Sequence, residues 1–344
     1  MPVHPKDVLF VDGAPLPVMP VCQHFAGNEK FIRKAFAQQR ATATALVSTL
    51  INSTANGAMA VFDVLCDLED GAATGQERET AEMVGTLIAS DDNSFARAGV
   101  RIHDAAHPHC MKDVEIIVRM AGAKLAYITL PKCDGRMDAL KIASYINHVA
   151  EENGIRRMIP MHVMIETHRG LREVFDIVEL PQIQGVTLGI MDFVSGFQGA
   201  IPASAMSSPG QFEHPLVRRA KLEISSAGLG NGAIPIHTIT QDYKDLSVVE
   251  TDARRARSEF GYLCKYSIHP DQIAPVVKGM QPNQVEIEDA TAILISAQNK
   301  DWGPVGHKGR LHDRASYRYY WQLLDRASRT GASIPDEART AFFN

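Results

Sequence analysis

The sequence predicts an α/β protein with a closed (β/α)8 TIM barrel and a C-terminal helical segment. Two observations predict this fold class. The length of 344 residues fits one α/β barrel of roughly 250 residues plus an appendage. Short apolar runs also alternate with amphipathic stretches, without the glycine fingerprint of a dinucleotide-binding sheet. A closed barrel is therefore favoured over an open doubly wound sheet.

Each predicted strand is a short apolar run that ends near a polar or charged residue. A first strand is expected near Pro17–Cys22. Between the strands lie amphipathic stretches such as Asp138–Glu152, where apolar residues recur at helical spacing and Asn153-Gly154 ends the helix. The remaining strands are predicted at Ala60–Leu68, Gly99–His103, Leu125–Pro131, Met161–Glu166, Gly185–Asp192, Ala233–Thr238 and Tyr262–His269.

The chain is expected to divide into a barrel over residues 1–280 and a helical lid or oligomerisation segment over 281–344. The strand and helix alternation stops at this boundary, and helices are predicted over Glu286–Gln298 and Ser316–Arg329. The segment Ser195–His214 is long and rich in Gly, Pro, Ala and Ser. A loop of this length inside a compact domain is usually functional, and this one follows the sixth predicted strand.

Composition excludes several classes of function. Apolar residues make up 45% and charged residues 22%, and the net charge is −5, with no dense Lys/Arg run. Nucleic acid and membrane partners are therefore not expected, and a small-molecule substrate is. The five cysteines show no C-x-x-C spacing, and the chain has neither a signal-like start nor an apolar run long enough for a membrane helix. We expect a cytoplasmic protein with reduced thiols.

The polar residues at the predicted strand ends are the candidates for chemistry, because the carboxyl ends of parallel barrel strands surround the active site. They are rich in carboxylates and lack paired Cys and His ligands, which suits a hard divalent ion such as Mg²⁺ or Mn²⁺. These candidates are Asp67, Glu69, Asp70, Arg101, His103, Lys132, Glu166, Asp192, Lys265 and His269.

Glu166 and Asp192 are the best pair of metal ligands, because each ends a strongly apolar run and the two runs are consecutive strands. A rim salt bridge or a helix cap is the structural alternative for this pair. For Asp67, Glu69 and Asp70 the choice lies between capping the next helix and organising the surroundings of the metal.

Arg101 could hold a carboxylate or a developing oxyanion, and its structural alternative is an ion pair with the acidic residues. A Schiff-base aldolase would need a barrel lysine, for which Lys132 and Lys265 are the candidates. Lys132 stands beside the acidic residues, where a carboxylate partner would keep it protonated. We therefore assign Lys132 to substrate binding with Arg101, and His107-Pro-His109 to a loop.

Six motifs in order resemble the HpcH/HpaI aldolase/citrate lyase family, in particular its branch of citrate lyase beta-subunit-like and malyl-CoA lyase-like proteins. The resemblance covers about residues 60–315. The motifs are DLEDG at Asp67–Gly71, VRI at Val100–Ile102, LPK at Leu130–Lys132, IET at Ile165–Thr167, GIMD at Gly189–Asp192 and GYLCKYSIHPDQ at Gly261–Gln272.

The resemblance implies roles for the same residues. Glu166 and Asp192 would bind Mg²⁺, and Arg101 would contact the oxygen on which negative charge develops. Glu69 and Asp70 would organise the outer shell of the metal.

The C-terminal segment also has a counterpart in this branch, where a G-x-M-x-D segment closes over a neighbouring subunit and delivers an acidic residue. Gly309–Asp313 is similar, which makes Asp313 a candidate acid/base supplied in trans, unless it is a surface turn residue. A homo-oligomer, trimer or hexamer, is implied.

The implied activity is a Mg²⁺-dependent carbon–carbon lyase that cleaves or forms a 3-hydroxyacyl-CoA, with an acyl-CoA and a 2-oxo acid as the other side of the reaction. The CoA thioester would be a substrate and not a cofactor. The chain departs from the family pattern at Pro17–His24, at His103 and in the segment Ser195–His214. Two alternatives stay open: an aldolase acting on free 2-oxo acids without CoA, and a non-catalytic subunit that binds an acyl ligand or serves as a scaffold.

Overall fold

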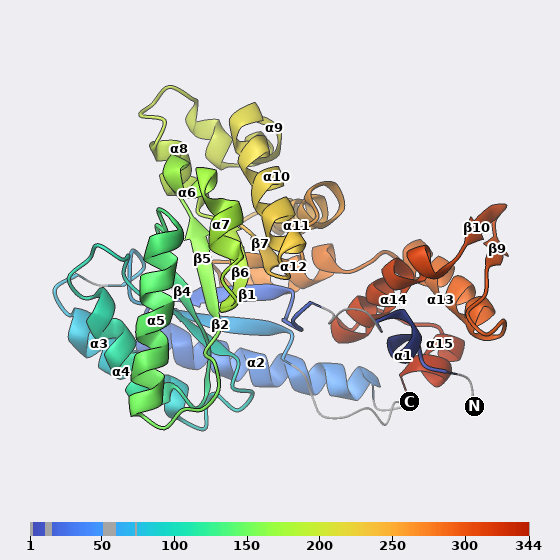
Figure 1. Cartoon of the computed structure of the whole chain (residues 1–344), viewed down its shortest axis with the longest axis horizontal. Helices are drawn as coiled ribbons and strands as arrows, with labels where there is room; N and C mark the ends of the chain where they lie inside the picture. The colour runs from blue at the N-terminus through green and yellow to red at the C-terminus, as the bar shows by residue number, and fades with distance from the viewer. Residues whose placement is uncertain (1–2, 11–15, 51–59, 73, 344) are drawn as a thin grey trace. The chain divides into compact units, whose positions relative to one another are not determined.

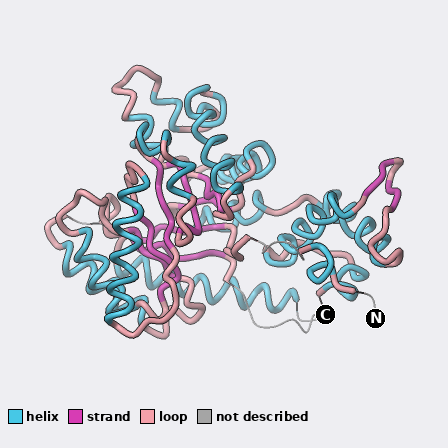
Figure 2. Tube along the Cα trace, in the orientation of Figure 1, coloured by secondary structure: helices cyan, strands magenta, loops and turns pink. Residues whose placement is uncertain are grey.

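Eight parallel strands form a closed barrel in the order of the sequence (Figure 1). The computed structural model describes residues 3–10, 16–50, 60–72 and 74–343. Strands gather at the centre of the barrel and helices surround them (Figure 2). This is the predicted (β/α)8 TIM barrel. Its strands are β1 (Cys22–Ala26), β2 (Phe62–Asp67), β3 (Ala98–Arg101), β4 (Leu125–Leu130), β5 (Met161–Ile165), β6 (Ile183–Leu188), β7 (Ile234–His237) and β8 (Cys264–Ser267).

The first strand lies further along the chain than the sequence predicts. The prediction placed it near Pro17–Cys22, whereas β1 begins at Cys22 and pairs with Phe62 of β2 and Lys265 of β8. Pro17 and Pro20 have no backbone N–H to donate to a strand ladder, so regular pairing starts only after them.

The helices between the strands pack their apolar sides on the barrel wall, and the helix predicted over Asp138–Glu152 is α5, which begins two residues earlier at Arg136. The segment predicted as a long loop, Ser195–His214, instead contains two short helices, η1 and α9. The helices between and after the barrel strands are α2 (Glu29–Leu50), of which residues 42–50 count with the second unit described below, α3 (Glu77–Ala89), α4 (Cys110–Ala121), α5 (Arg136–Glu152), α6 (His168–Arg172), α7 (Val174–Val178), α8 (Ile190–Ser195), η1 (Ala203–Met206), α9 (Gly210–Glu213), α10 (Pro215–Gly230), α11 (Leu246–Phe260), η2 (Pro270–Gln272) and α12 (Ile273–Met280).

The register of the strands places Asp67 and Arg101 side by side, at the same height along the barrel axis. Asp67 of β2 pairs with Arg101 of β3, and Arg101 pairs with Thr129 of β4. Residues paired in register across parallel strands point to the same side of the sheet. These three side chains therefore face the barrel interior together, near the carboxyl ends of the strands.

A second compact unit contains residues 281–344 with the described parts of 1–16 and 42–61. Its apolar core includes Leu294, Trp321 and Leu324. An N-terminal capping box at Asn283 starts the first long helix of the C-terminal segment. The elements of this unit are α1 (Pro5–Leu9), α13 (Gln284–Gln298), β9 (Val305–His307), β10 (Arg310–His312), α14 (Arg314–Arg329) and α15 (Asp336–Phe342).

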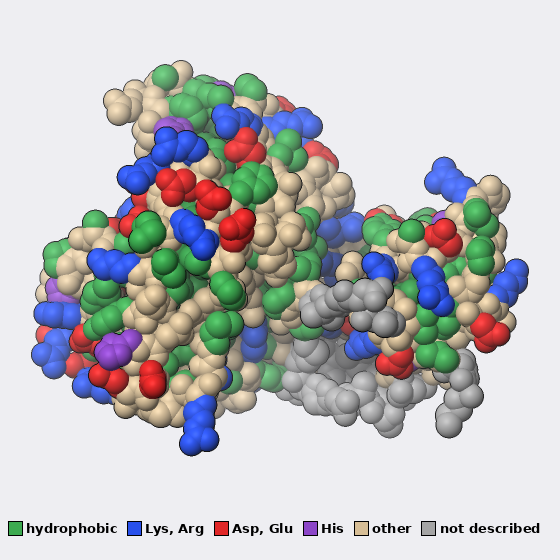
Figure 3. Space-filling view, in the orientation of Figure 1, with side chains coloured by type: hydrophobic (Ala, Val, Ile, Leu, Met, Phe, Trp, Pro, Cys, Tyr) green, Lys and Arg blue, Asp and Glu red, His purple; other side chains and the backbone are tan. Residues whose placement is uncertain are grey.

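The surface of the barrel unit mixes charges of both signs. Figure 3 shows Lys and Arg side chains interspersed with Asp and Glu over the face that carries α5, α7 and α10. Within the described residues, every helix is too short or too polar to cross a membrane.

Substitution of Gly99 tests whether the ring of Tyr127 packs directly against it in the barrel. A Cβ at Gly99 would lie 2.2 Å from Cε2 of Tyr127, inside the ring's contact distance. Gly99→Ala is therefore expected to lower the free energy of unfolding by about 1–3 kcal/mol. Urea denaturation measures this change. Gly230→Ala is the control, because a Cβ there meets no atom within 4 Å, and its stability should be unchanged or slightly higher. Equal stability of both variants would contradict the packing.

Candidate active site

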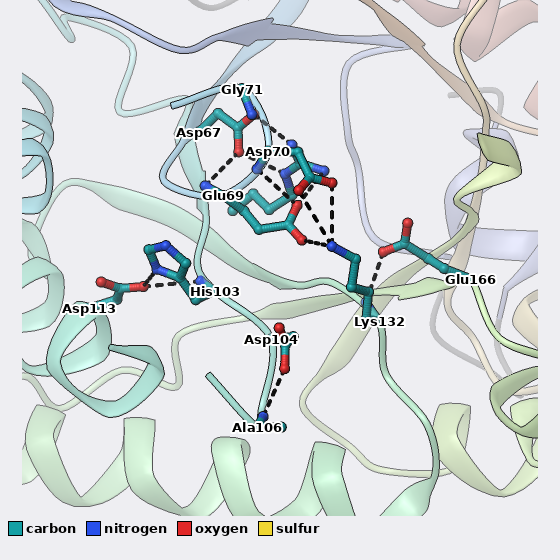
Figure 4. Close-up of polar contacts among 11 residues, drawn as sticks. Asp67, Glu69, Asp70, Gly71, His103, Asp104, Ala106, Asp113, Lys132 and Glu166 are labelled. Carbon is teal, nitrogen blue, oxygen red and sulfur yellow. Dashed lines mark hydrogen bonds and ion pairs between the residues drawn. The ribbon is translucent and has the colours of Figure 1, made fainter. Parts of the chain in front are cut away.

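The carboxyl ends of β2, β3, β4 and β5 bring together six of the candidate residues: Asp67, Glu69, Asp70, Arg101, Lys132 and Glu166. Figure 4 shows Glu69 and Asp70 of the turn after β2, and Glu166 after β5, on opposite sides of Lys132. Arg101 ends β3. The site was predicted from residues at strand ends, and these ends meet because the strands are parallel neighbours in one barrel.

Arg101 is held by a two-pronged ion pair. Its Nε and Nη2 donate to Oδ1 and Oδ2 of Asp67 at 2.7 and 2.6 Å, and its Nη1 lies 3.0 Å from Oε2 of Glu69. All three side chains are buried from solvent. Burial alone would lower the pKa of Arg101, but its bonds and charge contacts with Asp67 and Glu69 raise the pKa above its ordinary value. The guanidinium is fixed in place and remains charged.

Asp67 also shapes the turn that follows it. Its Oδ1 accepts from the N–H of Glu69 at 3.1 Å and its Oδ2 from the N–H of Gly71 at 3.0 Å. A Cβ at Gly71 would lie 2.2 Å from Oδ2 of Asp67, so only glycine allows the turn to close this tightly. The turn brings Glu69 back to Arg101.

Lys132 connects the two groups of carboxylates. Its backbone is in the left-handed region, with φ of 46°, which directs its N–H to Oε1 of Glu166 at 2.8 Å. Its Nζ donates to Glu69 and lies 3.3 Å from Oδ2 of Asp70. Burial lowers the pKa of Lys132, yet these carboxylates raise it above its ordinary value, so the amine stays protonated. A charged amine is a poor Schiff-base nucleophile.

Glu166 is a buried carboxyl beside other negative charge. Burial, together with the charges of Asp192 and Glu69, raises its pKa to about 8, although the Lys132 N–H and Arg101 act against the rise. A Cβ at residue 189 would lie 2.2 Å from Oε2 of Glu166, so Gly189 makes room for this side chain. Asp192, in the first turn of α8, is half-buried and acts on both Glu166 and Lys132 through its charge.

The donor set fits a hard divalent cation. Glu166 and Asp192 place two carboxylates near each other in a poorly solvated site, where a cation would offset their repulsion. Within the described ranges, no group of three or more His, Cys, Asp or Glu side chains is arranged to hold a metal ion. Two carboxylates leave coordination positions for water and substrate oxygens, which suits Mg²⁺ better than a structural zinc ion.

Two further residues singled out in the sequence, Lys265 and His103, lie apart from this group, and a third, Asp313, lies in the other compact unit of the chain. Asp313 belongs to the second unit, where it is exposed and caps α14, its Oδ1 accepting from Ala315 N at 3.0 Å. Lys265 is buried against Thr238 O, at 2.6 Å from its Nζ, and does not contact the carboxylates. Nδ1 of His103 lies 2.6 Å from Oδ2 of Asp113, which also accepts from the backbone N–H of His103 at 3.0 Å, and Figure 4 shows this pair away from Lys132.

Sequence reasoning missed a buried polar network on the other side of the barrel wall. Lys221 Nζ donates to Gln211 Oε1 at 2.8 Å and lies 2.9 Å from His237 Nε2, and Nδ1 of His237 lies 3.3 Å from Lys265 Nζ. Asp252 accepts from Gln211 Nε2 at 3.0 Å. A lysine within a surface helix such as α10 gives no sequence signal of burial, because most such lysines are solvated.

The fold and the site define an enzyme of the (β/α)8 barrel class with an acidic site at the carboxyl ends of its strands. The chain belongs to the HpcH/HpaI aldolase/citrate lyase family, whose model matches residues 48–270, and it is a lyase. The family predicted from six sequence motifs is thus confirmed.

Several known proteins are similar over most of their length. A citrate lyase from Burkholderia xenovorans LB400, known from a crystal structure, is 45% identical, with a TM-score of 0.83 over 99% of this chain and all of that one. An L-malyl-CoA/beta-methylmalyl-CoA lyase from Cereibacter sphaeroides is 26% identical, covering 73% of this chain and 83% of that protein. Protein CitE from Mycobacterium tuberculosis, solved with magnesium, acetoacetate and coenzyme A, shares the fold at 19% identity and a TM-score of 0.64, over 90% of this chain and 98% of that one.

The burial of Glu166 and the negative charges near it predict a raised pKa for its carboxyl group. In the metal-free protein its carboxyl should lose its proton at about pH 8, so it is neutral below and charged above that value. Asp192→Asn should lower this pKa by removing a negative neighbour, and Arg101→Gln should raise it by removing a positive one. Carbon-13 NMR of labelled glutamate, assigned with Glu166→Gln, measures the titration. A midpoint near the ordinary 4.5 of a glutamate would contradict the burial of the carboxyl.

Proposed function

We propose that the protein is a Mg²⁺-dependent carbon–carbon lyase that interconverts a 3-hydroxyacyl-CoA with an acyl-CoA and a 2-oxo acid. The observation that carries this proposal is the pair Glu166 and Asp192 beside the fixed guanidinium of Arg101. Relatives named L-malyl-CoA/beta-methylmalyl-CoA lyase and a structural neighbour solved with magnesium and coenzyme A support it. Residues 281–344 are proposed to act as the lid of the site.

Glu166 and Asp192 would hold Mg²⁺, which when bound polarises a 2-oxo acid carbonyl or the matching alkoxide. Lys132 orients Glu166 through its backbone N–H and is itself paired with Glu69 and Asp70. These contacts fix the carboxylate before substrate arrives. Preorganised ligands require less reorganisation during the reaction.

Arg101 keeps donors for the substrate. A guanidinium has five N–H groups, and Arg101 uses Nε and one N–H of Nη2 on Asp67 and one N–H of Nη1 on Glu69. The second N–H on each terminal nitrogen is available for an oxygen on which charge develops.

In the cleavage direction the hydroxyl proton passes to solvent, the bond between C2 and C3 of the acyl chain breaks, and its electron pair passes into a thioester enolate. The former hydroxyl carbon becomes the carbonyl of the 2-oxo acid. The enolate then takes a proton at carbon, for which Asp313 of a neighbouring subunit is the proposed acid. The products are the acyl-CoA and the 2-oxo acid.

One observation favours a second candidate, an aldolase acting on free 2-oxo acids. β1 (Cys22–Ala26) carries no Lys or Arg, whereas the family resemblance implies an arginine on the first strand that helps to hold the acyl thioester. The scaffold alternative has less support, because a non-catalytic subunit has no need for the arranged Glu166, Asp192 and Arg101.

A substrate panel tests the proposal. With Mg²⁺, the protein should cleave malyl-CoA or citramalyl-CoA but not free malate or citramalate, and chelation by EDTA should stop turnover. Glu166→Gln should reduce turnover at least about 100-fold, as loss of a metal ligand exceeds loss of an outer contact. Its thermal midpoint should change little, because Gln matches the neutral carboxyl that a pKa of about 8 implies at pH 7.

Asp104→Asn is the matched control for this panel. Asp104 is a carboxylate near the same strand ends, but it accepts from Ala106 N at 2.9 Å and does not contact the site group. Its turnover should equal that of the unaltered protein. Cleavage of free acids alone would replace the proposal by the aldolase alternative, and absence of all turnover would favour the scaffold.

Subunit mixing tests the proposed role of Asp313. Asp313→Asn removes the acid but retains the cap of α14, because Asn caps helices as well as Asp does. Asp313→Asn and Glu166→Gln chains should each be inactive alone, and hybrid oligomers should regain part of the activity, since some sites receive both intact residues. The assay is turnover after co-expression and separation by tags. Inactive hybrids would show that each subunit completes its own site or that Asp313 is not the acid.

A further inference from the structure

Asp192 differs from Glu166 in how the chain holds its side chain. The backbone N–H of Lys132 donates to Glu166 at 2.8 Å. Among the residues that the structure describes, no hydrogen bond or ion pair holds the carboxylate of Asp192. Its position therefore depends on α8, which has only six residues. A helix this short is not stable alone, so packing against its neighbours must keep it in place.

Three aromatic rings connect α8 to α6, the helix that follows Glu166 (Figure 1). His168 begins α6 two residues after Glu166, and Phe193 follows Asp192 directly in α8. The rings of His168 and Phe193 meet edge to face, with their centroids 4.9 Å apart. The ring of Phe197 lies 4.3 Å from that of His168 and 5.6 Å from that of Phe193. We call these three residues the ring cluster.

The ring cluster reaches both ends of the segment around Asp192. Gly196 is the C-cap of α8, and a Cβ there would lie 3.3 Å from Nε2 of His168. Successive residues of an α-helix are rotated by about 100°. Asp192 therefore acts on Glu166 while its neighbour Phe193 packs on His168. Phe197 belongs to the segment 195–214, which departs from the family pattern in the sequence.

We propose that the ring cluster holds Asp192 in place beside Glu166 and so positions one ligand of the proposed metal site. The cluster joins the residue that follows one ligand to a residue two places after the other. It thereby fixes the separation of the two backbone segments that carry the carboxylates. The inference rests on the proposed function, because it takes Glu166 and Asp192 as the metal ligands.

Electrostatics give the ring cluster a consequence for metal binding. A divalent ion needs both carboxylates in their charged form, and in that form Glu166 and Asp192 repel each other. Edge-to-face contacts between aromatic rings are favourable and oppose a separation of α8 from α6. The cost of bringing the ligands together is then met when the chain folds. Ligands ordered in advance bind more tightly than ligands that must be ordered on binding.

Mn²⁺ binding to the full-length protein without substrate tests the proposal. Free Mn²⁺ is counted by its electron paramagnetic resonance signal, which gives the dissociation constant. His168→Ala should raise this constant at least about 10-fold, as does loss of other groups that orient metal ligands. His168→Phe should restore the affinity of the unaltered protein, because a phenyl ring keeps the contacts with Phe193 and Phe197. His168 is exposed, so its urea midpoint of unfolding should change little in either variant.

Phe175→Ala is the matched control. Phe175 is 47% exposed and lines the same surface hollow as the ring cluster, but it belongs to α7, which carries none of the candidate site residues. Its removal should leave the Mn²⁺ dissociation constant unchanged. An equal loss of affinity in this variant would show that the contact between α6 and α8 is not the cause, and the proposal would fail.

A cycle of variants tests whether the rings act as one unit. Phe197→Ala should weaken Mn²⁺ binding in the same direction as His168→Ala. The double variant should lose less than the product of the two separate losses, because each substitution removes part of the same packing. Losses that multiply fully would contradict a shared cluster.

Amide hydrogen exchange of the metal-free protein gives a readout that needs neither metal nor substrate. Residues 190–195 should exchange faster in His168→Ala than in the unaltered protein, and at the unaltered rate in His168→Phe. Faster exchange combined with unchanged Mn²⁺ affinity would reduce the ring cluster to a structural contact and overturn the proposal.

The Mn²⁺ measurement separates failure of this inference from failure of the proposed function. If the unaltered protein does not bind Mn²⁺, the proposed metal site is wrong and this inference falls with it. If the unaltered protein and His168→Ala bind Mn²⁺ equally well, the metal site stands and only the role of the ring cluster is overturned.

Discussion

The buried ion pair between Arg101 and Asp67 is the interaction on which the candidate site depends. Asp67 holds both Arg101 and the turn that returns Glu69 to the same guanidinium. Glu69 in turn binds Lys132, whose backbone N–H orients Glu166. The contacts therefore run without a gap from β2 to β5. Removing one member would leave an uncompensated buried charge, so the geometry of the potential metal ligand is linked to an ion pair two strands away.

The acidic residues of the site differ in whether a positively charged side chain contacts them. Asp67 and Glu69 contact Arg101, and Glu69 and Asp70 contact Lys132. Glu166 receives only a neutral backbone N–H from that lysine, while Asp192 and Glu69 add negative charge near it. A site with this surplus favours either a proton or a cation. The same carboxyl can therefore be neutral in the empty protein and a ligand when a divalent ion is present.

The sequence predicted the barrel, and it singled out the residues that the barrel brings together, because both depend on local patterns. Apolar runs ending in polar residues mark strand ends, and parallel strands bring consecutive ends together, so Glu166, Arg101 and Lys132 meet. The predicted position of the first strand is wrong because it was based on apolar character alone. Pro17 and Pro20 lack the backbone N–H groups that a strand needs for pairing. The sequence does not show which way a side chain points. The pairing of Asp67 with Arg101 follows from the register between β2 and β3, and the burial of Lys221 follows from the packing of α10.

The polar interior shows why side-chain direction matters beyond the site. In sequence, Gln23, Thr129 and Thr187 are polar residues within largely apolar strands, and either face of the sheet would have been possible for them. The barrel turns them inward together with Tyr127 and Tyr266, and Gly99 gives the Tyr127 ring its space. Apolar side chains would pack the interior as densely, but they would not reduce the desolvation cost of the charged groups at the carboxyl ends of the strands. Polar groups in the interior reduce that cost and allow buried charged groups to be retained at the strand ends.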